Sequence, residues 1–114
     1  MSKPTPDQPT DRDLAAIVRH FGQARILVIG DVILDRYRIG EAQRLSPEAP
    51  IPVLRPTRRH DTPGGAANVA MNVATLGGHA VLAGVIGDDR AGKTVARLLD
   101  EAASIENALI VAAD

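Results

Sequence analysis

Apolar side chains recur along this chain with two different spacings, and each spacing predicts a type of element. Residues 25–30 contain a continuous apolar run, Ile-Leu-Val-Ile, closed by Gly-Asp, which predicts a buried strand in the centre of a parallel sheet. Gly22 is expected to end a helix over residues 11–21. In that helix the apolar residues keep a spacing of three to four positions: Leu14, Ile17, Val18 and Phe21.

The second half of the chain alternates between the same two patterns. Helices are predicted at about 65–76 and over 91–103, and strands over 80–86 and 108–111. Apolar residues keep helical spacing on one face of each helix: Val69, Val73 and Leu76 in the first, and Val95, Leu98 and Leu99, expected to face inward, in the second. Strands and helices that alternate in this way are typical of an α/β protein with a doubly wound parallel sheet.

Residues 36–60 differ from the rest of the chain in their pattern of residues. Polar and apolar residues alternate there, and three prolines, Pro50, Pro52 and Pro56, exclude a central strand with a full ladder of hydrogen bonds. Edge strands tolerate proline. We therefore expect two short strands that form a β-flap outside the main sheet.

Composition excludes several classes of partner and site. The net charge of −1 argues against nucleic acid or an anionic membrane as the main partner. Without cysteine there is neither a disulfide framework nor a thiolate metal site. No metal-ligand spacing links His20, His60 and His79, so no metal site is predicted. The basic cluster Arg55, Arg58, Arg59 and His60 is interpreted as a solvated strand end.

The N-terminal residues carry no sign of a targeting or spanning segment. Residues 1–10 are rich in Pro, Thr, Asp and Gln, which predicts a disordered tail. No apolar run in the chain approaches the roughly 20 residues that span a bilayer. A cytoplasmic protein is the expectation.

A glycine pair directly precedes the predicted helix at 65–76. Gly64 and Gly65 would let the backbone approach a ligand and would direct free N–H groups at it. The helix dipole favours polar oxygens at that end, and the Asn68 amide, one turn in, can both donate and accept. These features suit a hydroxyl-rich ligand. A tight turn before a buried alanine helix is an equal alternative on the glycines alone.

Two carboxylates follow the first predicted strand. Ligands of open parallel sheets bind beyond the carboxyl ends of the strands, where Asp31 and Asp35 stand. A carboxylate there can accept hydrogen bonds from two sugar hydroxyls. Turn formation or capping is an equal interpretation for Asp31. For Asp35 we favour ligand binding, because the flap begins immediately after it.

Residues 87–94, Gly-Asp-Asp-Arg-Ala-Gly-Lys-Thr, match the P-loop pattern between a strand and a helix. Two carboxylates, Asp88 and Asp89, would then stand inside the phosphate nest, where like charges repel. We favour the alternative that one of them caps the helix and that Lys93 is a solvated residue of its first turn.

Several segments together resemble the N-terminal part of a ribokinase-type (PfkB) sugar kinase, over residues 25 to about 111. The shared motifs are Val28-Ile29-Gly30-Asp31 with Asp35, Gly64-Gly65-x-x-Asn68-x-Ala70 continuing to Leu76-Gly77, and Gly87-Asp88-Asp89-x-x-Gly92. Longer strings match one branch of the family, which acts on a sugar phosphate: residues 30–37, 44–53 (which include Ser46-Pro47-Glu48-Ala49-Pro50) and 63–72.

The resemblance implies a ribokinase-like fold over residues 11–114, with 36–60 as the β-flap or lid that closes over the sugar and pairs two subunits in a homodimer. The residues it implies for substrate binding are Asp35 for the hydroxyls, with Asp31 close by, Gly64, Gly65 and Asn68 as pocket lining, and Arg36 and Arg44 for the sugar phosphate. Guanidinium groups suit the last role because they bind phosphate bidentately.

The family's catalytic Asp, in a Gly-Ala-Gly-Asp segment, lies in its C-terminal half with the ATP pocket and the magnesium-organising residues. The resemblance therefore implies an ATP- and Mg²⁺-dependent kinase whose catalytic residues lie beyond residue 114, and a fragment that by itself binds no cofactor and is inactive. Two alternatives remain: a non-catalytic sugar-binding or dimerisation module, and a P-loop nucleotide binder.

Overall fold

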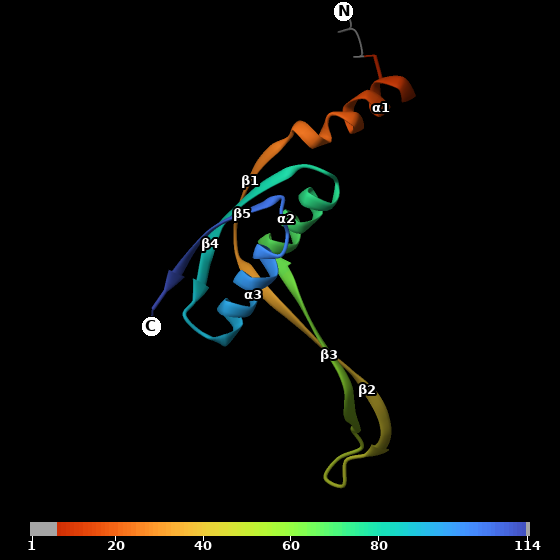
Figure 1. Cartoon of the computed structure of the whole chain (residues 1–114). Helices are drawn as coiled ribbons and strands as arrows, with labels where there is room; N and C mark the ends of the chain where they lie inside the picture. Colours follow the sequence, from red (N-terminus) through yellow and green to blue (C-terminus); the bar gives the residue numbers. More distant parts are fainter. Residues whose placement is uncertain (1–6, 114) are drawn as a thin grey trace, which may run out of the picture.

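In the computed structural model, which describes residues 7–113, a small α/β unit carries two projections, a helix at one end and a long hairpin at the other (Figure 1). The molecule measures 72 × 36 × 29 Å and has a radius of gyration of 20.9 Å. A closely packed chain of this length would have a radius of gyration of about 13 Å. The two projections therefore lie largely outside the packed unit.

The N-terminal projection is helix α1, Asp11–Arg19, followed by a 3₁₀ turn, η1, Phe21–Gln23. Thr10 begins α1 with a capping box, in which its hydroxyl accepts from the Asp13 N–H and the Asp13 carboxylate accepts from the Thr10 N–H. The predicted apolar stripe is present but exposed, with Ile17 55% accessible. Of the predicted tail, residues 1–6 lie outside the described residues, and 7–10 form no helix or strand.

The main sheet has three parallel strands in the order β1-β4-β5: β1 Arg25–Ile29, β4 His79–Gly87 and β5 Ile105–Ala112. The parallel arrangement is confirmed. The central position predicted for the first strand is wrong among the described residues, where β4 is central. The reason lies in the two crossovers, because the first places β4 beside β1 and the second places β5 on the far side of β4.

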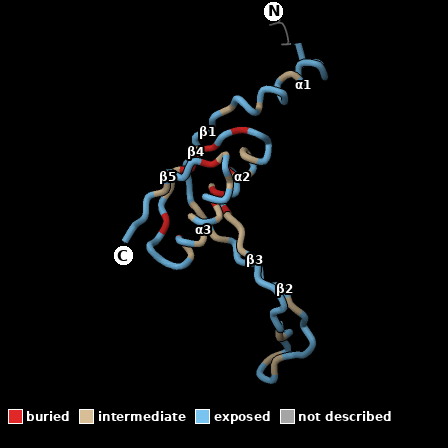
Figure 2. The backbone as a smooth tube through the Cα atoms, viewed as in Figure 1, coloured by how far each residue is buried: buried red, intermediate tan, exposed pale blue. Residues whose placement is uncertain are grey.

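Two helices cover one face of this sheet: α2, Ala66–Thr75, and α3, Arg90–Asp100 (Figure 2). The predicted inward face of α3 is confirmed for Val95 and Leu99, which are buried, while Leu98 is half-buried. Helix α2 instead buries its alanines, because small side chains let it approach the sheet closely. The buried apolar residues are Val28, Ala67, Ala70, Ala80, Leu82, Ile86, Val95, Leu99 and Ile105.

No element among residues 7–113 covers the opposite face of the sheet, so the first predicted strand is buried on one face only. Leu27 and Ile29 of β1 are 60% and 72% exposed, and Val85 and Ile110 of the other strands are similarly open. A doubly wound sheet carries helices on both faces. The described residues supply one of these two layers.

The second projection is an antiparallel hairpin of β2, Val32–Leu45, and β3, Pro52–Gly65. The flap is confirmed, but its strands have 14 residues each and extend beyond the predicted 36–60. The register shifts between Ile39 and Gly40, where Pro56 enters the pairing and the Thr57 hydroxyl donates to the Ile39 carbonyl at 3.1 Å. A two-stranded ribbon has two free edges, which is why it accommodates proline along its length.

Candidate functional site at the hairpin root

Most of the predicted site residues meet at the root of the hairpin, beyond the carboxyl end of β1. The Gly30 N–H donates to the Ala83 carbonyl of β4 at 3.3 Å, which fixes the end of β1 against the central strand. The Ala66 N–H, the first of α2, donates to the Asp31 carbonyl at 2.8 Å. These two bonds tie the strand end, the hairpin and the start of α2 into one junction.

Gly65 is the residue on which this junction depends. It precedes α2 at φ 58°, a conformation that other residues rarely adopt. A Cβ at this position would also collide with the carbonyl oxygen of Asp31. Only glycine therefore allows β3 to end and α2 to begin this close to the Asp31 backbone. This close approach is to the backbone of Asp31, and the predicted approach of the glycine pair to a ligand stays a prediction.

Asp35 and Gly64 lie together on one face of the hairpin. Gly64 pairs with Ile33 and Asp35 with Thr62, so the two residues are diagonal neighbours in the ladder. A Cβ on Gly64 would lie 2.8 Å from the Asp35 carboxyl carbon. The Asp35 carboxylate thus occupies the space left by the missing side chain, and it can accept hydrogen bonds from hydroxyl groups beside the glycine backbone.

Asn68 and Asp31 complete the group at the junction. Asn68 is exposed in the first turn of α2, and its amide makes no hydrogen bond to other residues within 7–113. The Asp31 side chain is also exposed. Side chains that can donate or accept hydrogen bonds and a helix N-terminus therefore lie in one region, an arrangement that suits a polar, uncharged ligand. The roles of these residues stay predictions.

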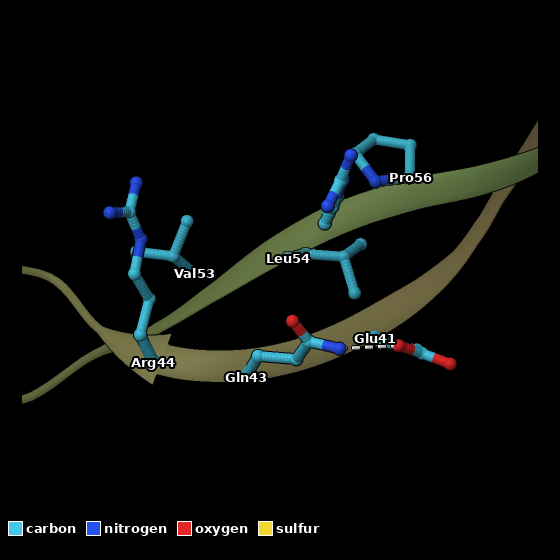
Figure 3. A pocket seen from close by; sticks show the side chains of 7 residues that line it. Glu41, Gln43, Arg44, Val53, Leu54 and Pro56 are labelled. Carbon is cyan, nitrogen blue, oxygen red and sulfur yellow. Dashed lines mark hydrogen bonds between the residues drawn. The ribbon is translucent and has the colours of Figure 1, made fainter.

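The two predicted phosphate-binding arginines lie elsewhere. Strand alternation places Arg36 on the hairpin face opposite Asp35, where its Nε is 3.9 Å from Asp61. Arg44 lies in the distal half of the hairpin, nine positions from Asp35, or roughly 30 Å along the strand. It lines a hollow of about 550 Å³. Figure 3 shows its side chain beside that of Val53, its partner in the ladder. The structure thus brings neither arginine together with Asp35 within one chain.

Three residues beside the site escaped the sequence reasoning. Thr62 pairs directly with Asp35, and Tyr37 and His60 pair two positions along, with ring centroids 6.4 Å apart. The alternation of the two strands about their antiparallel register is the signal that could have found them. The predicted basic cluster is solvated, as expected, but it lies within β3 and not at a strand end, and alternation divides it between the two hairpin faces.

In the P-loop-like segment, 87–94, a backbone N–H group is hydrogen-bonded to a carboxylate of the same segment. Asp89 precedes α3 and its side chain accepts from the Gly92 N–H at 2.7 Å. Lys93 extends to Asp88, with Nζ 3.4 Å from Oδ1. The capping interpretation is therefore confirmed. A phosphate would have to displace Asp89 from the backbone groups that a P-loop offers to its ligand.

The part of the chain that the structure describes contains neither a cluster of metal-ligating side chains nor a helix that could cross a membrane. No three or more His, Asp or Glu side chains gather there in an arrangement that could hold a metal ion. Among the same residues, no helix combines the length and the apolar character that crossing a membrane requires.

Comparison with known proteins settles the family. The model of the pfkB family carbohydrate kinases matches residues 23–111, which is most of the chain. The chain belongs to the pfkB family of carbohydrate kinases. The predicted resemblance to this family is thus confirmed.

Individual relatives agree with this assignment. The pfkB chain is 52% identical over 101 residues to the bifunctional protein HldE of Caulobacter sp. (strain K31), covering 89% of this chain and 21% of that protein. It is 57% identical over 81 residues to a D-beta-D-heptose 7-phosphate kinase of Bordetella bronchiseptica, covering 71% of this chain and 26% of the relative. The chain therefore spans about a quarter or less of the length of these relatives.

A solved structure supports the fold. The crystal structure of a provisionally assigned ribokinase from Agrobacterium tumefaciens superposes with a TM-score of 0.61 at 27% identity, over 78% of this chain and 28% of that chain. The ribokinase-like α/β class predicted from the sequence is thereby confirmed.

Proposed function

We propose that these residues form the substrate-side part of a kinase for D-glycero-β-D-manno-heptose 7-phosphate. The reaction would transfer a phosphoryl group from ATP to O1 and give the 1,7-bisphosphate, for the lipopolysaccharide core, in the cytoplasm. The observation that supports this choice of substrate is the 57% identity to a D-beta-D-heptose 7-phosphate kinase. The junction of Asp35 with the Gly64 backbone supports a sugar site, because it offers a carboxylate where hydroxyls can approach.

In this proposal the hairpin root binds the sugar. Asp35 accepts from two hydroxyls, and the backbone of Gly64 and Gly65 comes close to the ring. Asn68 and Asp31 contribute further polar groups at the same end of α2. A carboxylate with two acceptor oxygens fixes the orientation of neighbouring hydroxyls, which is the positioning that phosphoryl transfer depends on.

ATP and Mg²⁺ serve the complete enzyme. The described residues do not fit either group. No acidic cluster suits a metal ion, and in the P-loop-like segment the Asp89 side chain accepts from a backbone N–H that a phosphate of ATP would need. We therefore assign no step of the phosphoryl transfer to these residues, and we propose that the catalytic groups lie in other parts of the enzyme.

The hairpin would serve as a lid and as a dimer interface. Its side chains expose much apolar surface on an element with no core of its own, with Ile33 49%, Tyr37 54% and Leu45 60% accessible. Closure over the sugar would exclude water, which competes for the phosphoryl group. In this dimer the proposed phosphate role of Arg44 would act toward the partner subunit, since its own Asp35 is roughly 30 Å away along the strand.

Kinetics of the complete enzyme test the sugar site. Asp35→Ala should lower kcat/KM for heptose 7-phosphate by about 100-fold or more, because two hydrogen bonds to a charged group are lost. Asp100→Ala, which removes an exposed carboxylate at the end of α3, is the matched control and should behave as wild type. Wild-type kinetics for Asp35→Ala would refute its role.

The coding sequence beyond Asp114 separates the kinase from its alternative. A frame that continues and encodes Gly-Ala-Gly-Asp supports the kinase. A stop codon directly after Asp114 favours a non-catalytic sugar-binding or dimerisation module, for which flap-mediated dimers without turnover are the expected finding.

A further inference from the structure

A cleft of about 270 Å³ lies between the hairpin and helix α3, on the face of the hairpin opposite Asp35. Helix α3 contacts both hairpin strands there, close to where the hairpin leaves the α/β unit (Figure 1). We name it the arginine cleft, because four of its lining residues are arginines from three elements: Arg36 and Arg38 of β2, Arg59 of β3 and Arg90 of α3. Asp61, Thr94 and Tyr37 complete the lining, and Tyr37 belongs by its place in the ladder to the Asp35 face.

The positive charge of the arginine cleft is poorly compensated. Arg38 and Arg59 stand directly opposite each other in the ladder, a pairing of like charges that destabilises a hairpin. Neither of them, nor Arg90, forms an ion pair within residues 7–113. The one carboxylate in the lining, Asp61, approaches Arg36 only to 3.9 Å.

Helix α3 adds to this field. Arg90 is its first residue, at the end where the helix dipole is positive. Lys93 and Arg97 continue along the same side of the helix and line a neighbouring hollow with Arg90 and Thr94. Lys93 is paired with Asp88 and Arg97 with Glu101, so among the described residues of α3 it is Arg90 that adds uncompensated positive charge beside the cleft.

We infer that the arginine cleft binds the phosphoryl group of a small soluble phosphate compound, separate from the sugar site. Three guanidinium groups without carboxylate partners offer planar pairs of N–H donors, the geometry that phosphate oxygens accept bidentately. The volume of the cleft suits one phosphate or pyrophosphate group. A bound dianion would also relieve the repulsion between Arg38 and Arg59.

Calorimetric titration of the complete protein with inorganic phosphate and with pyrophosphate tests the proposal. We expect saturable binding in low-salt buffer that Arg59→Gln weakens by about tenfold or more, since a charged hydrogen-bonding group is lost. Arg58→Gln is the matched control, because it removes the neighbouring arginine from the other face and should leave the affinity unchanged. Arg59→Lys keeps the positive charge but loses the planar pair of N–H donors of the guanidinium group. Its affinity for phosphate should lie between those of the wild type and Arg59→Gln.

Three outcomes would overturn the inference. The first is an absence of binding to both probes by the wild-type protein. The second is an equal loss in Arg58→Gln and Arg59→Gln, which would indicate general charge attraction. The third is Arg59-dependent binding only to vesicles of equal parts phosphatidylglycerol and phosphatidylcholine, which would indicate a membrane surface.

One further variant separates this inference from the proposed function. Asp35→Ala should leave phosphate binding intact, because Asp35 lies on the other hairpin face. If Asp35→Ala abolishes phosphate binding, the anion occupies the sugar site and the inference is wrong. If Asp35→Ala keeps both phosphate binding and wild-type kinetics, the sugar site is refuted and the arginine cleft stands.

Discussion

The α/β unit and the hairpin are stabilised in different ways. Every buried apolar residue belongs to β1, α2, β4, α3 or β5, and none lies in β2 or β3 (Figure 2). The hairpin beyond its root is held by its backbone ladder and by exposed cross-strand pairs. An isolated two-stranded hairpin is marginal in water. Side-chain packing therefore stabilises the unit, while the hairpin remains open to partners and ligands.

This difference shows where binding residues can be placed. The proposed sugar site and the arginine cleft both use the hairpin, one on each of its faces. Positions with no core to maintain can carry Asp35 or three arginines without loss of packing. Substitutions in the two regions should consequently differ in kind, and the following predictions test that difference in the complete protein.

The largest effect is expected in the core. Leu82 is fully buried in the central strand, so Leu82→Ala should reduce the free energy of unfolding by about 2–5 kcal/mol. Leu54→Ala in the hairpin is the matched control, since Leu54 is 46% exposed and should cost far less. Chemical denaturation measures both. Equal losses would show that the hairpin also has a packed core.

A smaller and local loss of stability is expected at Gly40, where the register of the hairpin shifts. A Cβ on Gly40 would collide with the Arg55 carbonyl oxygen and lie 2.9 Å from Pro56 Cα, so Gly40→Ala should cost about 1–3 kcal/mol. Amide hydrogen exchange should quicken in β2 and β3 and stay unchanged in β4. Gly22→Ala is the control, because its Cβ meets only the Gly77 carbonyl oxygen, at 3.8 Å. Faster exchange throughout β4 would contradict a local effect.

At the hairpin root the expected change is in binding. Gly64→Ala should displace the Asp35 carboxylate, since the new Cβ would meet it, and should raise KM for the sugar about tenfold with little change in Tm. This prediction rests on the proposed function. Steady-state kinetics combined with thermal unfolding measure it, again with Gly22→Ala as control. A large fall in Tm at unchanged KM would assign Gly64 to stability alone.

The smallest effect is expected in α1. Hydrogen bonds from the Thr10 side chain and backbone hold the pKa of Asp13 below its ordinary value. A carboxyl with a lowered folded pKa stabilises its helix above the unfolded pKa and loses that effect as pH falls through the folded pKa. NMR chemical shifts of residues 11–19 should show loss of helix below about pH 4. Asp13→Asn should remove this pH dependence, and Asp11→Asn should keep it.

Much of the fold was predictable because the spacing of apolar residues and the capping residues indicate the same elements. The spacing of Val95 and Leu99 specifies the buried face of α3, and Asp89 caps it as its position suggests. The buried face of α2 matches the alternative of a tight turn before a buried alanine helix. The spacing of Val69, Val73 and Leu76 did not predict it, because alanine gives a weak hydropathic signal. The length of the hairpin was missed because the prolines suggested interruptions, which a two-stranded ribbon accommodates.

The sequence by itself determined the α/β class, the parallel sheet, the flap and the family motifs, since these follow from short-range spacing and shared strings. Only the tertiary structure decided which residues meet. Adjacent residues of a strand face opposite sides, so Asp35 and Arg36 separate, while Arg38, Arg59 and Arg90 come together from three elements. Such juxtapositions depend on register and crossover, which no local pattern records.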